Sequence, residues 1–346
     1  MKDGYFIFDN VVHMYDNTPA NVINDIGKKN IEGFHKTFGA TGHSLYRIED
    51  KLTLTTDEAL NYLFEHSDTD MAMAQTVPLF GLWEEGFAPA RLQYALKEAC
   101  PERIVFCGGV DPLFHGIRGA VREMERQKEE WGAVSFKYYK AHGPRLTWKA
   151  DDRDIAYPMW EKAQKLGISH VQFHCGLPFG HERVEDLRPN DIQAAAADFP
   201  DLIFVIHHLG LPYLDETINI AGRYENVWLS LSSIVFNTWA VSPWDTYARL
   251  GTVLRSVGNK KVLWGSEAFI WPDVQPLIEL FAGMKMPEEL QDRYGFPEIS
   301  EESKRNIFGL NQARLLGIDV ERKMRELSPA MTDAERARSA GHAKAA

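Results

Sequence analysis

The chain has 346 residues, of which 45% are hydrophobic and 25% charged, and its formal net charge is -11 at pH 7. This composition is typical of a soluble globular protein, and the length suits two average domains or one large α/β barrel. The acidic balance argues against a nucleic-acid partner, which would require a basic surface. No apolar run approaches the ~20 residues of a membrane span. With no secretory leader and no CxxC pair among its three cysteines, we expect a cytoplasmic protein without disulfides.

Short apolar runs recur along the chain, and their length is typical of strands buried on both faces of a parallel sheet. Taken in chain order, they occupy residues 5–12, 71–77, 104–110, 133–139, 169–174, 202–208, 227–232 and 261–267. Stretches with the 3.6-residue periodicity of helices lie between them, at 115–132, 156–167, 214–224 and 244–258. A last helix is predicted over 299–318, after a surface excursion at 285–300.

Eight strands alternating with helices predict an α/β protein, a (β/α)₈ barrel formed by a single domain over residues 1–328. Residues 14–70 are too long for an ordinary first crossover and predict an insertion after the first strand. Residues 329–346 are small and charged, and predict a tail that is mobile or contacts a neighbouring subunit. The alternative is an open doubly wound sheet, but no GxGxxG or GxxxxGK[ST] loop follows any predicted strand.

Titratable residues follow the predicted strands where functional side chains gather in a barrel, at the carboxyl ends. Imidazole nitrogen and carboxylate oxygen together suit Zn, Fe, Mn or Co better than Ca or Mg. The pattern therefore predicts a metal site on one face of the barrel. The residues concerned are His13, Glu84, Glu85, Lys137, His174, His207, His208 and Glu267.

Each of these residues also has a purely structural interpretation. His13 could be a buried core histidine, and Glu84 and Glu85 are typical of a solvated loop. Of His207 and His208, which point to opposite sides if the strand continues, one is expected to be structural; we assign His208 to the metal. Glu267 follows a strongly apolar strand, where an unpaired carboxylate is costly.

At these residues the chain resembles the amidohydrolase-related family, which contains aminocarboxymuconate-semialdehyde decarboxylase and related hydratases and hydrolases. The resemblance runs from about residue 5 to residue 318 and implies a metal-dependent (β/α)₈ barrel. It rests on DNVVH (9–13), FK in SFKYY, QFHCG, HHLG, LWGSE and NIFGLNQARLLGI.

Two positions depart from the family pattern. The first-strand signature D-x-H-x-H has Val11 at its first ligand position, so only His13 remains, and the last-strand G-S-D ends here in Glu267. If Glu84 or Glu85 replaces the missing ligand, the set with His13, His174, His208 and Glu267 could hold two metals. A divergent branch of the family, the dinuclear 2-aminoisobutyric acid hydroxylase subunits, resembles this chain in outline.

Three functions follow as hypotheses. The first is O₂-dependent hydroxylation of a small carboxylate-bearing substrate at a dinuclear Fe or Fe/Mn site, which needs an electron donor. Here His207 and Lys137 are catalytic, Arg145 or Lys137 binds the carboxylate, and Trp83 excludes water. The alternative is a mononuclear Zn or Mn hydrolase or non-oxidative decarboxylase with His208 as general acid/base. The third is an inactive paralogue that supports an active partner. We expect a homo-oligomer, or a hetero-oligomer with a paralogous subunit.

Overall fold

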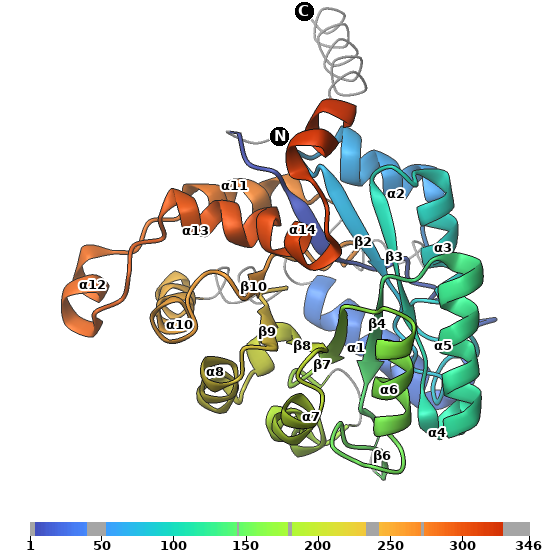
Figure 1. Cartoon of the computed structure of the whole chain (residues 1–346). Helices are drawn as coiled ribbons and strands as arrows, with labels where there is room; N and C mark the ends of the chain where they lie inside the picture. The colour runs from blue at the N-terminus through green and yellow to red at the C-terminus, as the bar shows by residue number, and fades with distance from the viewer. Residues whose placement is uncertain are drawn as a thin grey trace, which may run out of the picture.

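Eight parallel strands form a barrel at the centre of the computed structural model, with helices around it (Figure 1). The structure describes residues 4–39, 53–143, 145–178, 182–232, 242–270 and 273–327. The barrel strands are β1 (Phe8–Val12), β2 (Met71–Gln75), β3 (Ile104–Gly109), β4 (Ser135–Tyr139), β7 (His170–His174), β8 (Ile203–Ile206), β9 (Val227–Ser230) and β10 (Val262–Leu263). A small hairpin, β5 (Ala141–Gly143) and β6 (Leu146–Thr147), follows β4.

Helices and short helical turns fill the connections between the strands. They are α1 (Asp25–Gly39), α2 (Thr56–Leu60), η2 (Asn61–Glu65), α3 (Ala90–Ala99), α4 (Pro112–His115), α5 (Ile117–Trp131), α6 (Tyr157–Lys165), η3 (Val184–Leu187), η4 (Pro189–Asp191), α7 (Ile192–Asp198), η5 (His207–Gly210), α8 (Leu214–Arg223), α10 (Pro243–Ser256), α11 (Gln275–Gly283), α12 (Glu288–Tyr294), α13 (Glu301–Arg305), η6 (Asn306–Leu310) and α14 (Asn311–Leu316). None of the described helices is both long and apolar enough to cross a membrane.

The strand order β1-β2-β3-β4-β7-β8-β9-β10 follows the sequence. Backbone hydrogen bonds join the last strand region back to the first: the Asn10 amide donates to the Trp264 carbonyl at 3.0 Å, and the Glu267 amide to the Val11 carbonyl at 3.1 Å. All eight predicted strands are therefore present, and the (β/α)₈ prediction is confirmed. The first connection contains α1 and α2, while residues 40–52 of the predicted insertion and the predicted tail at 329–346 lie outside the described residues.

Alternation along the strands separates the outer core from the barrel interior. Tyr138, Phe173 and Phe204 pack around Trp160 of α6, with ring centroids 5.0, 5.5 and 5.8 Å from it. Because neighbouring strand residues point to opposite faces, Lys137 and Gln172 point into the barrel. The same apolar contacts that hold the helices on the outside thus fix which polar side chains enter the interior.

Candidate metal centre

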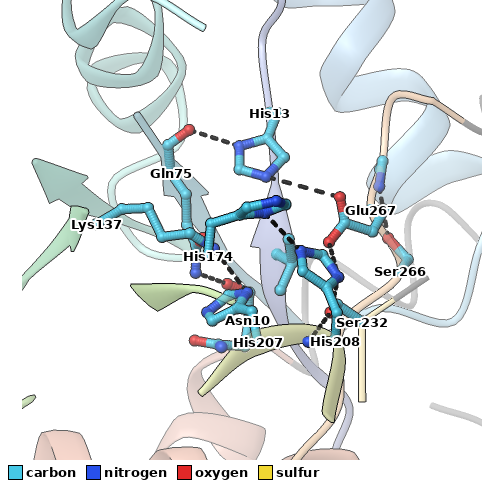
Figure 2. A network of polar contacts seen from close by, with 12 residues as sticks. Asn10, His13, Gln75, Lys137, His174, His207, His208, Ser232, Ser266 and Glu267 are labelled. Carbon is cyan, nitrogen blue, oxygen red and sulfur yellow. Dashed lines mark hydrogen bonds and ion pairs between the residues drawn. The ribbon is translucent and has the colours of Figure 1, made fainter. Parts of the chain in front are cut away.

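Four of the predicted residues, His13, His174, His208 and Glu267, lie together at the carboxyl ends of the strands (Figure 2). Each is at most 5% exposed. Nε2 of His13 lies 3.9 Å from Oε2 of Glu267, and Nδ1 of His208 lies 3.6 Å from Oε1. Nδ1 of His174 is 3.0 Å from Nε2 of His208. Strand ends far apart in the sequence thus bring three imidazoles to one carboxylate.

The backbone at this edge is held in unusual conformations. Strand β8 ends at Ile206, so His207 and His208 both lie in the turn η5 that follows it. Left-handed conformations of non-glycine residues cost about 1–3 kcal/mol each and concentrate at functional sites. Five of the described non-glycine residues with positive φ are at this edge of the barrel: Leu177, His208, Leu209, Ser232 and Glu267.

The hydrogen bonds of the rings show which nitrogens carry lone pairs. His13 Nδ1 lies 2.8 Å from the Gln75 carbonyl, and His174 Nε2 lies 3.0 Å from the Leu177 carbonyl. A carbonyl only accepts, so these nitrogens carry the hydrogens. The opposite nitrogens, His13 Nε2 and His174 Nδ1, therefore hold lone pairs that are turned toward the centre.

Ser232 contacts the remaining ring. Its hydroxyl oxygen lies 2.9 Å from His208 Nδ1 and accepts from the His208 backbone amide at 3.2 Å. The same hydroxyl lowers the pKa of Glu267. His208 Nε2 lies 3.0 Å from His174 Nδ1, so the two rings turn these nitrogens toward each other.

Two nitrogens at this distance either share a hydrogen or bind one cation between them. Two ligand atoms about 2.1 Å from a tetrahedral ion lie about 3.4 Å apart, comparable with the 3.0 Å between His174 Nδ1 and His208 Nε2 and the 3.9 Å between His13 Nε2 and Glu267 Oε2. The outward hydrogen bonds of all three rings are of the kind that orients metal-binding histidines. His13, His174, His208 and Glu267 are thus the residues that could hold the ion.

The electrostatics agree with a ligand set of neutral imidazoles. Burial, reinforced by the positive charge of Lys137, lowers the pKa of His13 and of His174 to about 3. Burial raises the pKa of Glu267, while Lys137 opposes that increase. Without a metal, this carboxylate has little to stabilise its negative charge except Lys137 and the Ser232 hydroxyl.

His207 is placed differently from its neighbour. His207, His208 and Glu267 offer ligand atoms within 4.8 Å of one another. Both ring nitrogens of His207 are nevertheless engaged, Nδ1 with Lys137 at 2.7 Å and Nε2 with Gln172 at 2.8 Å. We therefore do not count it among the donors to the ion, and its position favours contact with Lys137 over direct acid/base catalysis.

The prediction that Glu84 or Glu85 replaces the missing ligand is wrong in this structure. Both side chains are exposed, and Glu85 pairs with Arg91 at 2.6 Å. Strand β2 ends at Gln75, and the eight residues that follow it take the chain to the surface before Glu84. Gln75 itself, whose carbonyl accepts from His13, occupies the strand end.

Val11, at the family's first ligand position, is fully buried against the last strand. A Cβ atom on Gly265 would lie only 2.5 Å from Val11 Cγ2, so the valine packs directly on the glycine backbone. The pairing of β1 with β2 shifts by one residue between Asp9 and Val12, as at a β-bulge. The position is therefore filled by an apolar contact rather than left open for a metal.

Trp83 and Arg145, the predicted substrate-binding residues, differ in their surroundings. Trp83 is buried and stacks on Phe87 at 4.6 Å in an aromatic cluster that includes Tyr139. Tyr139 in turn stacks on His174 at 4.7 Å, so this cluster walls one side of the centre. Arg145 is exposed between β5 and β6, and no described contact joins it to the four residues.

Sequence reasoning missed the neutral members of the site. Gln75, Gln172 and Ser232 carry no charge and match no motif, yet each hydrogen-bonds a histidine. Strand alternation could have found Gln172, because it lies two residues before His174 on the same face of β7.

Comparisons with known proteins agree with the architecture. The family model described as Amidohydrolase matches residues 48–318. No protein of curated function matches the chain. An uncharacterised TIM-barrel protein from Bordetella bronchiseptica has a similar structure, with a TM-score of 0.66 and 18% identity over 90% of this chain and 98% of that one.

Two further solved structures are enzymes. The 4-oxalomesaconate hydratase of Rhodopseudomonas palustris has a TM-score of 0.55 and 16% identity, over 95% of this chain and 100% of its own. The 5-carboxyvanillate decarboxylase of Novosphingobium aromaticivorans, solved with manganese and 4-hydroxy-3-methoxy-5-nitrobenzoic acid, has a TM-score of 0.54 and 13% identity, over 92% and 97%. At these identities the likeness shows a shared fold.

Proposed function

The chain belongs to the amidohydrolase family, and on that premise we propose that it is a hydrolase or non-oxidative decarboxylase. It would act on a small carboxylate-bearing substrate with one divalent metal ion. The observation that carries the proposal is the convergence of His174 Nδ1 and His208 Nε2, 3.0 Å apart, with His13 and His208 also within 4 Å of the Glu267 carboxylate. Three imidazoles and one carboxylate suffice for one ion.

When bound, such an ion supplies Lewis-acid charge and activates water at neutral pH. The residues of the chain supply the remaining steps. Ser232 lies 2.9 Å from His208 Nδ1 and lowers the pKa of Glu267, so its hydroxyl orients these two side chains. Lys137 offers its amino group to an anionic substrate in the interior, and Tyr139 and Trp83 exclude water on one side.

The structure argues against the dinuclear oxygenase hypothesis. A second metal requires a glutamate ligand after the second strand, and both candidates, Glu84 and Glu85, are exposed. His207, the other additional donor, has both nitrogens engaged. Without these donors, the described residues retain enough ligands for one metal only. The dinuclear oxygenase is therefore the second candidate function, and the test below distinguishes it from the hydrolase or decarboxylase.

The test compares turnover with and without metal and oxygen. Protein stripped with chelator is reloaded with Zn(II) or with Mn(II). Manganese is present in one of the solved structures of the same fold. It is then incubated with a panel of aromatic and aliphatic carboxylic acids, and products and CO₂ are measured. We expect turnover that needs the metal and is equal in air and under argon. Turnover only in air with reductant would contradict the proposal, and a protein that neither binds metal nor reacts would be the supporting paralogue.

A further inference from the structure

A layer of polar side chains fills the barrel interior beside the metal-centre residues. All of its members are fully buried. Barrel interiors are usually packed with branched apolar side chains, and buried polar groups are costly unless each is hydrogen-bonded. A polar layer at this position therefore points to a role other than packing. Its members are Asn10, Gln75, Lys137, Gln172 and His207.

Gln172 fixes the direction of the hydrogen bonds in this layer. Its Oε1 atom lies 3.0 Å from both Asn10 Nδ2 and Gln75 Nε2, which are donors. Its own Nε2 donates to the Ser135 hydroxyl at 3.2 Å. The opposite orientation of the amide would set donors against donors, so Oε1 must be the acceptor at the centre of the layer.

The orientation of Gln172 determines the tautomer of His207. His207 Nε2 lies 2.8 Å from Gln172 Oε1 and must carry the hydrogen. His207 Nδ1 therefore has a lone pair, which accepts from Lys137 Nζ at 2.7 Å. Gln75 uses its amide nitrogen on Gln172, which leaves its Oε1 atom as a second acceptor for Lys137 at 3.4 Å.

Lys137 is left with donor capacity beside the metal-centre residues. An ammonium group has three N–H donors, and the described residues supply two acceptors, His207 and Gln75. Burial lowers the pKa of Lys137 to about 7, while the Glu267 carboxylate raises it. In its charged form, Lys137 acts on His13, His174 and Glu267. Lys137 thus offers a donor and a charge on the side of the interior where the metal-centre residues lie.

We propose that this layer is a built carboxylate subsite, in which Lys137 binds the substrate carboxylate, while Gln172 and His207 are positioning residues that orient the ammonium group. The inference rests on the proposed function for the identity of the anion as part of a substrate. It assigns the carboxylate to Lys137 rather than to the exposed Arg145. It also explains why His207 is histidine, since the ring bridges an amide and an ammonium.

The test is calorimetric titration of the metal-loaded protein with formate, acetate and benzoate, with benzamide as the neutral counterpart of benzoate. We expect Lys137→Met to weaken binding of the carboxylates at least tenfold and to leave benzamide binding and metal content unchanged. His207→Leu should weaken carboxylate binding similarly. His207→Asn, which keeps an acceptor near the position of Nδ1, should restore most of it. Arg153→Met removes an exposed cation elsewhere and should have no effect.

Two results would overturn the subsite: a wild type that binds none of the three carboxylates, or Lys137→Met and His207→Leu proteins that bind them as tightly as the wild type. Equal losses for benzoate and benzamide would also overturn it, because they indicate a structural role. Lys137-dependent carboxylate binding in a protein without metal-dependent turnover would refute the proposed function and leave the subsite standing.

Discussion

At the scale of single residues, Glu267 carries a large electrostatic cost. Its carboxylate is 5% exposed, lies among neutral imidazoles and has an Oε1 atom without a hydrogen-bond partner among the described residues. Such a group is stable as an anion when a cation is bound next to it. The residue is therefore both the strongest candidate ligand and a source of instability in the metal-free protein.

This instability predicts a pH dependence. Burial raises the pKa of Glu267 to about 7, from 4.5 in the unfolded chain. The folded chain then binds this proton more tightly than the unfolded chain, so the contribution of Glu267 to the free energy of unfolding falls by on the order of 3 kcal/mol as the pH rises from 4.5 to 7. The buried histidines, such as His13 and His174, contribute in the opposite direction. Glu267→Gln should leave the contribution of the histidines and remove that of Glu267. Urea unfolding in EDTA at pH 5 and pH 7.5 measures it, and an equal pH dependence in both proteins would contradict the assignment.

Val11 gives a second prediction at this scale. Because its side chain already packs against the Gly265 backbone, Val11→His should overpack the junction of the first and last strands. We expect a loss of about 1–3 kcal/mol in unfolding free energy and no additional bound metal. Val11→Thr keeps the size and shape of valine and adds a polar group, so it separates the effect of polarity from that of overpacking. A Val11→His protein of wild-type stability that binds more zinc would show that the position remains open to a ligand.

At the scale of elements, the segments that follow β7 and β8 are in direct backbone contact. Gly176 follows β7 with a φ of +65°, and the Leu177 amide donates to the Leu211 carbonyl at 2.9 Å. A Cβ atom on Gly176 would lie 1.7 Å from that carbonyl oxygen. The turn that follows His174 therefore abuts the turn that contains His208, and the spacing of the two histidines depends on this glycine.

Gly176→Ala should consequently separate the two turns. Gly167, which also has positive φ but nothing within 4 Å of its Cβ position, provides the matched control. Gly167→Ala should cost about 1–2 kcal/mol through backbone strain alone, while Gly176→Ala should cost clearly more and lower metal affinity. Thermal unfolding and metal titration of both variants check this, and equal effects would mean that the two turns are not coupled.

The elements also show why the sequence predicted part of the site. Parallel strands end at one edge, so His13, His174, His208 and Glu267 had to lie near one another once their strands were recognised. The prediction of Glu84 as a ligand failed because β2 ends nine residues before it, and apolar periodicity does not encode the length of a turn. The amide side chains of the interior were not predicted for another reason. A neutral side chain that orients a histidine ring has no sequence signature besides the alternation of its strand.

At the scale of the whole molecule, different parts of the barrel serve stability and function. Its outer aromatic packing, such as Trp160 against β4, β7 and β8, fixes the strands. Its interior carries the polar layer, and its carboxyl-terminal edge carries the metal-centre residues. The sequence predicted this architecture because alternating strands and helices leave few topologies.

The metal content of the reconstituted protein tests the central claim most directly. Chelator-treated wild type, His174→Ala and Glu267→Gln are each reloaded with Zn(II) or Mn(II) under argon, desalted and measured by elemental analysis, with circular dichroism as the check of folding. We predict one equivalent of metal per chain in the wild type and a small fraction of that in both folded variants. Two equivalents in the wild type, or full metal retention in both variants, would contradict the single centre formed by His13, His174, His208 and Glu267.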